Sequence, residues 1–213
     1  MKPDLTPVVH TLDATTRATH YGHPGAVLWL TGLSASGKSS LSMALEQALM
    51  ARGYSCYVLD GDNLRHGLNA NLGFSPAGRS ENIRRVGEVA ALFADAGLIC
   101  ITAFISPYRA DRARARQSCR SQFHEIHVAA SLATCEARDP KGLYRKARSG
   151  ELQDFTGISA PYEAPEHPDL TIDTTSDSLP ASLQKLLDYV IAHYPLGAPA
   201  GSAGLAGAAD PTA

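Results

Sequence analysis

Short apolar runs alternate with segments of helical periodicity between residues 25 and 194. The apolar runs predict strands near residues 26–31, 54–59, 98–104, 123–129 and 169–173, and the periodic segments predict helices over 38–52, 80–96, 109–120 and 178–193. Ser80 is the expected N-cap of the second helix. This alternation predicts an α/β fold, a parallel sheet with helices on both faces. Ligands of such folds bind at the carboxyl ends of the strands, so functional residues are expected at that edge.

The two ends of the chain lack this pattern. Residues 1–24 are polar, contain Pro3, Pro7 and Pro24, and predict an N-terminal arm rather than an element of the core. Residues 195–213 are rich in Gly, Ala and Pro and predict a disordered tail, because they have little apolar surface to bury. One domain over residues 25–194 is therefore expected.

Composition narrows the range of partners. The 213 residues carry a net charge of −2 and the 19 basic residues are spread along the chain, so we expect no nucleic-acid partner. No apolar stretch approaches the roughly 18 to 20 residues that span a bilayer, and the N-terminus lacks the apolar core of a signal peptide, so no membrane is expected either. The four cysteines form no CxxC pair, and Cys56 and Cys100 lie in apolar runs, which favours a reduced, cytoplasmic protein.

The run GLSASGKSS directly follows the first predicted strand. It fits the pattern Gly-x4-Gly-Lys-Ser/Thr, in which glycines let main-chain N–H groups surround a phosphate. Lys38 then reaches the β- and γ-phosphates, and the Ser39 hydroxyl joins a Mg2+ shell. The run therefore predicts binding of a nucleoside triphosphate with Mg2+, its phosphates held by Gly32, Leu33, Ser34, Ala35, Ser36, Gly37, Lys38, Ser39 and Ser40.

Two carboxylates follow the second predicted strand, in LDGDNLRHGLN. Asp60 and Asp62 leave the sheet at the edge where the phosphate loop lies. A carboxylate there can order the waters of a metal ion or accept a proton from an attacking hydroxyl. Arg65 adds a cation close by. The alternative is an ordinary turn with solvated charges.

The next run, GFSPAGRSENIRR, adds candidate ligands. Phe74 offers an aromatic face on which a purine can stack, and guanidinium groups bind phosphate or sulfate oxygens in a bidentate way. Arg79 is expected in the loop before a helix and is the better candidate. At least one of Arg84 and Arg85 is expected on a solvated helix face.

Two later segments complete the candidate site. The third predicted strand ends in AFISPYR, where the main chain near Ser106 either lines an acceptor pocket or forms an ordinary turn. Residues 138–165 are charged and rich in Gly, which suits a lid that excludes water, with a plain solvated loop as the alternative. His124 and His127 are not spaced as helical metal ligands, so no metal site is assigned to them.

Taken in order, GLSASGKSS, LDGDNLRHGLN, GFSPAGRSENIRR, AFISPYR, RDPKGLYRKARSGELQDFTGI and APYEAPEHPDL resemble the motifs of the adenylylsulfate kinase family over about residues 25–190. The resemblance implies a P-loop NTPase-type sheet with a lid segment. It also implies transfer of the ATP γ-phosphate to the 3′-hydroxyl of adenosine 5′-phosphosulfate, giving 3′-phosphoadenylyl sulfate for sulfate assimilation. The alternatives are a kinase for another nucleotide-like acceptor and a non-catalytic nucleotide-sensing module, which should have lost Lys38 or Asp60.

The same resemblance implies roles for individual residues. Lys38, Asp60 and Ser106 form the implied catalytic set, with Asp60 and Ser39 at the metal. Arg138 and Lys141 belong to the lid, which covers both nucleotides as far as Phe155. The implied adenylylsulfate ligands are Asp62, Arg65, Phe74, Arg79, Asn82, Ile105, Ser106 and Phe155. Family members are usually dimers, which implies a homodimer, and functional coupling to ATP sulfurylase is a further implication.

Overall fold

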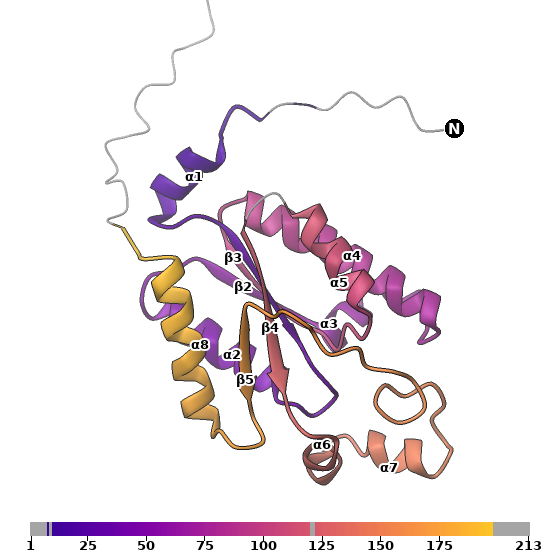
Figure 1. The fold of residues 1–213 in the computed structure, drawn as a ribbon. Coiled ribbons are helices and arrows are strands. Elements are labelled where there is room, and N and C mark those ends of the chain that lie inside the picture. The colour runs from indigo at the N-terminus through magenta and orange to yellow at the C-terminus, as the bar shows by residue number, and fades with distance from the viewer. Residues whose placement is uncertain (1–7, 9, 120–121, 198–213) are drawn as a thin grey trace, which may run out of the picture.

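The structure, a computed structural model, describes residues 8, 10–119 and 122–197. Five parallel strands form one sheet in the order β2-β3-β1-β4-β5 (Figure 1). All five predicted strands are present, with ends shifted by no more than two residues: β1 (Ala26–Thr31), β2 (Cys56–Asp60), β3 (Ile99–Ala103), β4 (Gln122–Ala129) and β5 (Leu170–Asp173). The predicted α/β fold with a parallel sheet is confirmed.

Helices cover both faces of the sheet. One face carries α2 (Lys38–Met50) and α8 (Leu179–His193), and the other carries α4 (Pro76–Asp95) and α5 (Arg109–Ser118) (Figure 1). Side chains of β1 alternate between them. Leu28 and Leu30 join the apolar cluster of α2 and α8, whereas Val27 and Trp29 join that of α4 and α5. The two faces are thus closed by apolar packing, which leaves the ends of the strands for polar chemistry.

Helix α4 begins four residues before its predicted start. Ser75 is the N-cap, its hydroxyl accepts the Gly78 N–H at 3.2 Å, and Pro76 occupies the first turn, where proline needs no N–H partner. The predicted cap, Ser80, instead donates to Asp111 Oδ2 on α5 at 2.7 Å. The sequence prediction was therefore wrong here, and Arg79 lies in the first turn of α4 rather than in a loop.

Four short helices were not predicted: α1 (Ala14–Tyr21), α3 (Gly61–Arg65), α6 (Leu132–Arg138) and α7 (Leu143–Arg148). Helix α1 lies within the predicted arm and buries no side chain. His23, just after it, is 1% exposed and accepts the Ser55 N–H at 3.0 Å, so the end of the arm does pack on the domain. The Gly197 N–H donates to Gly22 O at 2.8 Å, whereas residues 1–7 of the arm and 198–213 of the predicted tail lie outside the described residues.

The segment predicted as a lid, residues 138–165, forms a small core together with α6 and the phosphate loop. Helices α6 and α7 lie beyond the carboxyl ends of the strands (Figure 1). Cys135, Tyr144 and Phe155 are buried together, with ring centroids of Tyr144 and Phe155 5.0 Å apart, and Leu33 of the phosphate loop packs on them. The plain solvated loop is therefore excluded. In the described part of the chain, no helix is long and apolar enough to cross a bilayer.

Candidate active site

A cavity of about 1090 Å³ opens at the carboxyl ends of the strands. The phosphate loop, the exits of β2 and β3, the start of α4 and the lid line its wall. Most of the predicted site residues meet there: Ser34, Ala35, Gly37, Lys38, Ser39, Ser40, Asp60, Asp62, Arg65, Phe74, Arg79, Asn82, Ile105, Ser106, Arg138, Lys141 and Phe155. Three residues of the loop lie behind the wall, namely Gly32, Leu33 and Ser36. The cavity thus joins segments that are up to 148 residues apart in the chain, from Ser34 to Ser182.

The phosphate loop needs its glycines. A Cβ at Gly32 would lie 2.4 Å from Val128 O, and Gly37 has a φ of +99°, which L side chains rarely adopt. Helix α2 starts directly after Gly37 without a side-chain cap. Its first main-chain N–H groups therefore remain for an anionic ligand at the positive end of a helix of 13 residues.

Lys38 lies folded against this loop. Its Nζ donates to Gly32 O at 2.8 Å and to Leu33 O at 2.6 Å, and the side chain is buried. Burial lowers the pKa of the Lys38 ammonium to about 8, and within the part of the chain that the structure describes no carboxylate is bonded to it. A bound phosphate would supply the missing counter-charge at this position.

Asp60 and Ser39 meet at the edge of the loop. The Ser39 hydroxyl donates to Asp60 Oδ2 at 2.7 Å, and Asp60 Oδ1 accepts the Asp62 N–H at 3.0 Å as the N-cap of α3. Among the described residues, no three His, Cys, Asp or Glu side chains gather as a metal site. Mg2+ requires no such cluster, because one or two protein oxygens, phosphates and waters complete its octahedron. The hydroxyl and carboxylate of Ser39 and Asp60 fit that donor set.

Part of the cavity wall is cationic, where Arg65 and Arg79 lie beside Phe74. The guanidinium of Arg65 lies 4.2 Å from the centre of the Phe74 ring, and that of Arg79 lies 5.8 Å from it. Arg79 also donates to Thr156 Oγ1 at 3.0 Å and to Asp154 O, which ties α4 to the lid. Arg84 and Arg85 both pair with Glu81 instead, as a helix surface would.

Asn82 is a buried polar side chain of the cavity wall whose Oδ1 lacks a partner in the described part of the chain. It is 5% exposed, it lines the cavity, and its Oδ1 accepts no hydrogen bond. A buried acceptor without a donor costs about 1–3 kcal/mol. A ligand that donates to Asn82 Oδ1 would therefore recover that free energy.

The lid contacts the phosphate loop at several points. Arg138 donates to Ala35 O at 3.3 Å and to Thr174 Oγ1 at 3.2 Å, and Tyr144 Oη donates to Ser34 O at 3.0 Å. Lys141 pairs with Asp62 across the cavity mouth. These bonds place the lid over the loop.

Ser106 lies at the exit of β3 in a constrained position. It is 2% exposed and has a φ of +41°, a conformation that is unusual for a residue other than glycine. Its hydroxyl accepts the Trp29 Nε1–H at 3.1 Å and donates to Phe104 O at 3.4 Å, and Thr31 Oγ1 donates to Ile105 O at 2.7 Å. In the described residues around it, no histidine or carboxylate is bonded to the Ser106 hydroxyl.

A sequence model of the adenylylsulphate kinase family matches residues 24–173. The chain belongs to this family. The adenylyl-sulfate kinase of Staphylococcus epidermidis is 57% identical over 173 residues, covering 81% of this chain and 87% of that one. That of Oceanobacillus iheyensis is 59% identical over 169 residues, with 79% and 85% covered. The structure of the Mycobacterium tuberculosis APS kinase in complex with AMPPNP and APS superposes with a TM-score of 0.76 at 49% identity, covering 78% of this chain and 98% of that one.

Membership of the adenylylsulfate kinase family settles the acceptor that the residues alone left open. The reaction is transfer of the ATP γ-phosphate to adenosine 5′-phosphosulfate, as the resemblance implied. A sugar kinase structure at 16% identity, with a TM-score of 0.54, shares the fold alone. The fold of this chain is thus shared with a kinase outside the adenylylsulfate kinase family.

Several residues that contact this adenylylsulfate kinase site were missed from the sequence, among them Thr174, Tyr144 and Arg112. Thr174 donates to Ser36 O at 2.7 Å and, because it directly follows β5, the strand-end rule could have found it. Tyr144 and Arg112 lie inside short helices. Their neighbours carry no signal that marks them as inward-facing.

Proposed function

We propose that ATP and adenosine 5′-phosphosulfate occupy the two ends of this one cavity. The observation that carries the proposal is that the phosphate loop and the unpaired Asn82 line one and the same cavity. Two cations, Arg65 and Arg79, lie near Asn82 and suit the phosphosulfate group. Adenosine 5′-phosphosulfate is an anionic nucleotide, so its charge and its amino group match these side chains.

In this proposal the phosphate loop positions the donor. Lys38 leaves its carbonyl partners for the γ-phosphate and balances the charge that grows during transfer. Ser39 and Asp60 would hold Mg2+, which supplies charge neutralisation between the β- and γ-phosphates when bound. Asp60 Oδ2 already accepts a hydroxyl hydrogen bond from Ser39, so the same oxygen is suited to orient or deprotonate a hydroxyl.

The acceptor is held by the remaining predicted ligands. Asn82 accepts a hydrogen bond from the purine amino group, Phe74 gives it an aromatic face, and the Ile105–Ser106 wall borders the ribose. Phe155 and the lid exclude water, because an open site would transfer phosphate to water. Lys141 and Arg138 hold the lid in this position.

Ser106 shapes the acceptor wall and forms no phosphoserine in this mechanism. Its hydroxyl is buried, is bonded to Trp29 and Phe104, and has no bonded base in the described structure. Direct in-line transfer needs positioning and charge stabilisation, which the loop and Asp60 supply. Incubation with γ-labelled ATP alone should leave no acid-stable label on the protein. A stoichiometric phosphoserine at 106, discharged by adenylylsulfate, would contradict this.

The family resemblance also supports three broader proposals: a homodimer, functional coupling to ATP sulfurylase, and a cytoplasmic location. Light scattering of the purified protein tests the first of these. A monomer at micromolar concentration would contradict it.

The central experiment is a product assay. Purified protein with ATP and Mg2+ should form ADP only when adenosine 5′-phosphosulfate is added, and chromatography should show 3′-phosphoadenylyl sulfate in equal amount. Lys38→Ala serves as the inactive control. Equal ADP formation without the acceptor, or faster phosphorylation of another nucleotide, would contradict the proposal.

A further inference from the structure

The exit of β3 is held by contacts that the catalytic roles do not explain. Ile105, Ser106 and Pro107 line the acceptor end of the cavity, and Ser106 adopts a left-handed φ of +41°. Such a conformation persists only when surrounding contacts maintain it. Trp29 holds the Ser106 hydroxyl, but the main chain of this turn needs a separate partner.

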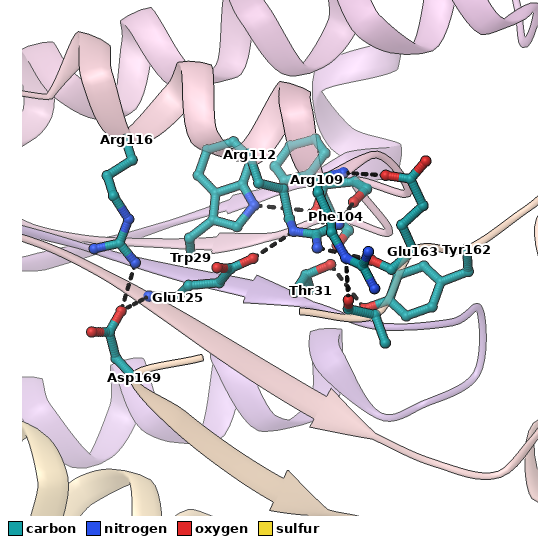
Figure 2. A network of polar contacts seen from close by, with 12 residues as sticks. Trp29, Thr31, Phe104, Arg109, Arg112, Arg116, Glu125, Tyr162, Glu163 and Asp169 are labelled. Carbon is teal, nitrogen blue, oxygen red and sulfur yellow. Dashed lines mark hydrogen bonds and ion pairs between the residues drawn. The ribbon is translucent and has the colours of Figure 1, made fainter. Parts of the chain in front are cut away.

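That partner is Arg112 on α5, which is 2% exposed. Its Nη1 donates to Ser106 O at 2.7 Å, its Nη2 donates to Glu163 O at 2.8 Å, and its Nε donates to Glu125 Oε1 at 2.5 Å. Figure 2 shows Arg112 between Glu125 of β4 and Glu163, which lies near the end of the lid segment. A planar guanidinium has a rigid set of donors, so one side chain fixes the relative position of three segments.

The end of the lid segment is joined to the same turn by further bonds. The Glu163 N–H donates to Pro107 O at 2.8 Å, and the Arg109 N–H donates to Glu163 Oε2 at 2.8 Å. Tyr162 Oη and Thr31 Oγ1 are 3.1 Å apart (Figure 2). The end of the lid segment and the acceptor wall therefore form one unit, with Arg112 inside it.

The ion pair between Arg112 and Glu125 is an inefficient way to stabilise a fold. Removing two charges from water costs about as much as their attraction returns, and apolar side chains of similar size often stabilise as well. Arg112 does, however, fix the geometry of this region, because only a guanidinium at this position can donate hydrogen bonds to Ser106 O and Glu163 O together. The arrangement thus favours a role in geometry.

We propose that Arg112 is a positioning residue for the acceptor: it holds the Ile105–Pro107 wall and the base of the lid at a fixed spacing, so that the 3′-hydroxyl of adenosine 5′-phosphosulfate lies in line with the γ-phosphate. This inference rests on the placement of the acceptor proposed above. Arg112 itself touches neither nucleotide in this arrangement. Its loss should therefore act on the acceptor and spare ATP, whose phosphate loop it does not contact.

The test uses Arg112→Lys, which keeps the charge beside Glu125 but cannot make the same planar set of bonds. The matched control is Arg116→Lys on the same helix. Arg116 also donates to a carboxylate and a carbonyl, Asp169 Oδ2 at 2.7 Å and Phe123 O at 2.8 Å, but is bonded to neither Ser106 nor Glu163. Steady-state kinetics with each substrate varied, and calorimetry with a non-hydrolysable ATP analogue, give the readouts.

We expect Arg112→Lys to lower kcat and raise the KM for adenosine 5′-phosphosulfate, so that kcat/KM for the acceptor falls at least tenfold, and to leave the KM for ATP and the Kd of the analogue within twofold. Arg116→Lys should leave all three within twofold. If Arg112→Lys does not fold, the double variant Arg112→Gln with Glu125→Gln carries the same expectation, because it leaves no unpaired buried charge. Unchanged acceptor kinetics, or equal loss for both substrates, overturns the proposal. A wild-type protein that does not phosphorylate adenosine 5′-phosphosulfate overturns the proposed function itself, before any variant is compared.

Discussion

Replacing Asp60 with asparagine separates the charge of this side chain from its structural role. Asparagine has the same shape and is as good an N-cap as aspartate. Its Oδ1 can accept the Asp62 N–H, and its amide can donate to the Ser39 hydroxyl, which is able to reverse its role. Both contacts that hold Asp60 therefore survive in geometry, and only the negative charge is lost.

The structural cost of this change is small. A charge-assisted hydrogen bond is worth about 1 kcal/mol more than a neutral one, so two bonds give at most about 2 kcal/mol. The buried carboxylate also no longer has to be desolvated, which offsets part of this loss. For a domain of this size, we expect the Tm to fall by no more than about 8 °C.

The catalytic cost should be larger. Loss of a positioned base or metal ligand lowers kcat by about 10² to 10⁴, which is about 3–5 kcal/mol in the barrier. KM values for both substrates should change far less, because the charge acts on the transition state. The assay is ADP formation at saturating substrates, with thermal unfolding alongside. Asp188→Asn, on α8 beside Gln184, is the matched control. A fall in kcat of less than tenfold, or an effect confined to KM, would refute the reasoning.

Three further predictions follow from the site and the core. Arg79→Ala should weaken adenosine 5′-phosphosulfate by about ten- to hundredfold through loss of charged hydrogen bonds, and ATP much less; equal weakening in calorimetry would contradict its placement. Burial lowers the pKa of Lys38 to about 8, and a bound phosphate should raise it again. ATP binding at pH 8.5–9, but not at pH 7, should therefore be accompanied by proton uptake. The measurement is the binding enthalpy, which then depends on the buffer. Burial lowers the pKa of His124, whose ring is hydrogen-bonded to Tyr189 and Tyr194. The unfolded state therefore binds the proton more readily than the folded state does, and the free energy of unfolding should decrease as the pH drops below about 6.5. His124→Gln should reduce the loss of stability between pH 7.5 and pH 5.5, measured by urea unfolding at both pH values. An unchanged loss would show that other groups cause it.

The strands were predictable because burial on both faces of a parallel sheet produces continuous apolar runs such as AVLWLT and LICITAF. Helices α1, α3, α6 and α7 were not, since they have eight residues or fewer and show hardly two turns of periodicity. The start of α4 was misplaced because Ser80 was chosen over Ser75, although Pro76 directly after Ser75 is the stronger helix-start signal. Elements with a specific local sequence signal could be predicted, whereas the short polar helices carry no such signal.

The residues of the site likewise divide into those that the sequence could predict and those that it could not. Residues that follow a strand, such as Asp60 and Ser106, could be named because the topology brings strand ends together. Arg112 could not, since it is one of four arginines in RADRARARQS and the sequence does not show which of them is buried. Only its packing between β4 and the end of the lid segment distinguishes it from Arg114, which is exposed on the same helix. The roles assigned to the individual ligands remain predictions.

The main-chain bond between Gly22 and Gly197 lies beside the start of β1, at the amino ends of the strands, whereas both nucleotides are placed at the carboxyl ends. A short peptide joining these two neighbourhoods would cross little space, so a circularly permuted chain opened at an exposed loop is a practical design. For the same reason, a surface linker or fluorescent label attached near either glycine would leave the mouth of the cavity clear. The enzyme could then be immobilised by that side and still receive both substrates from solution.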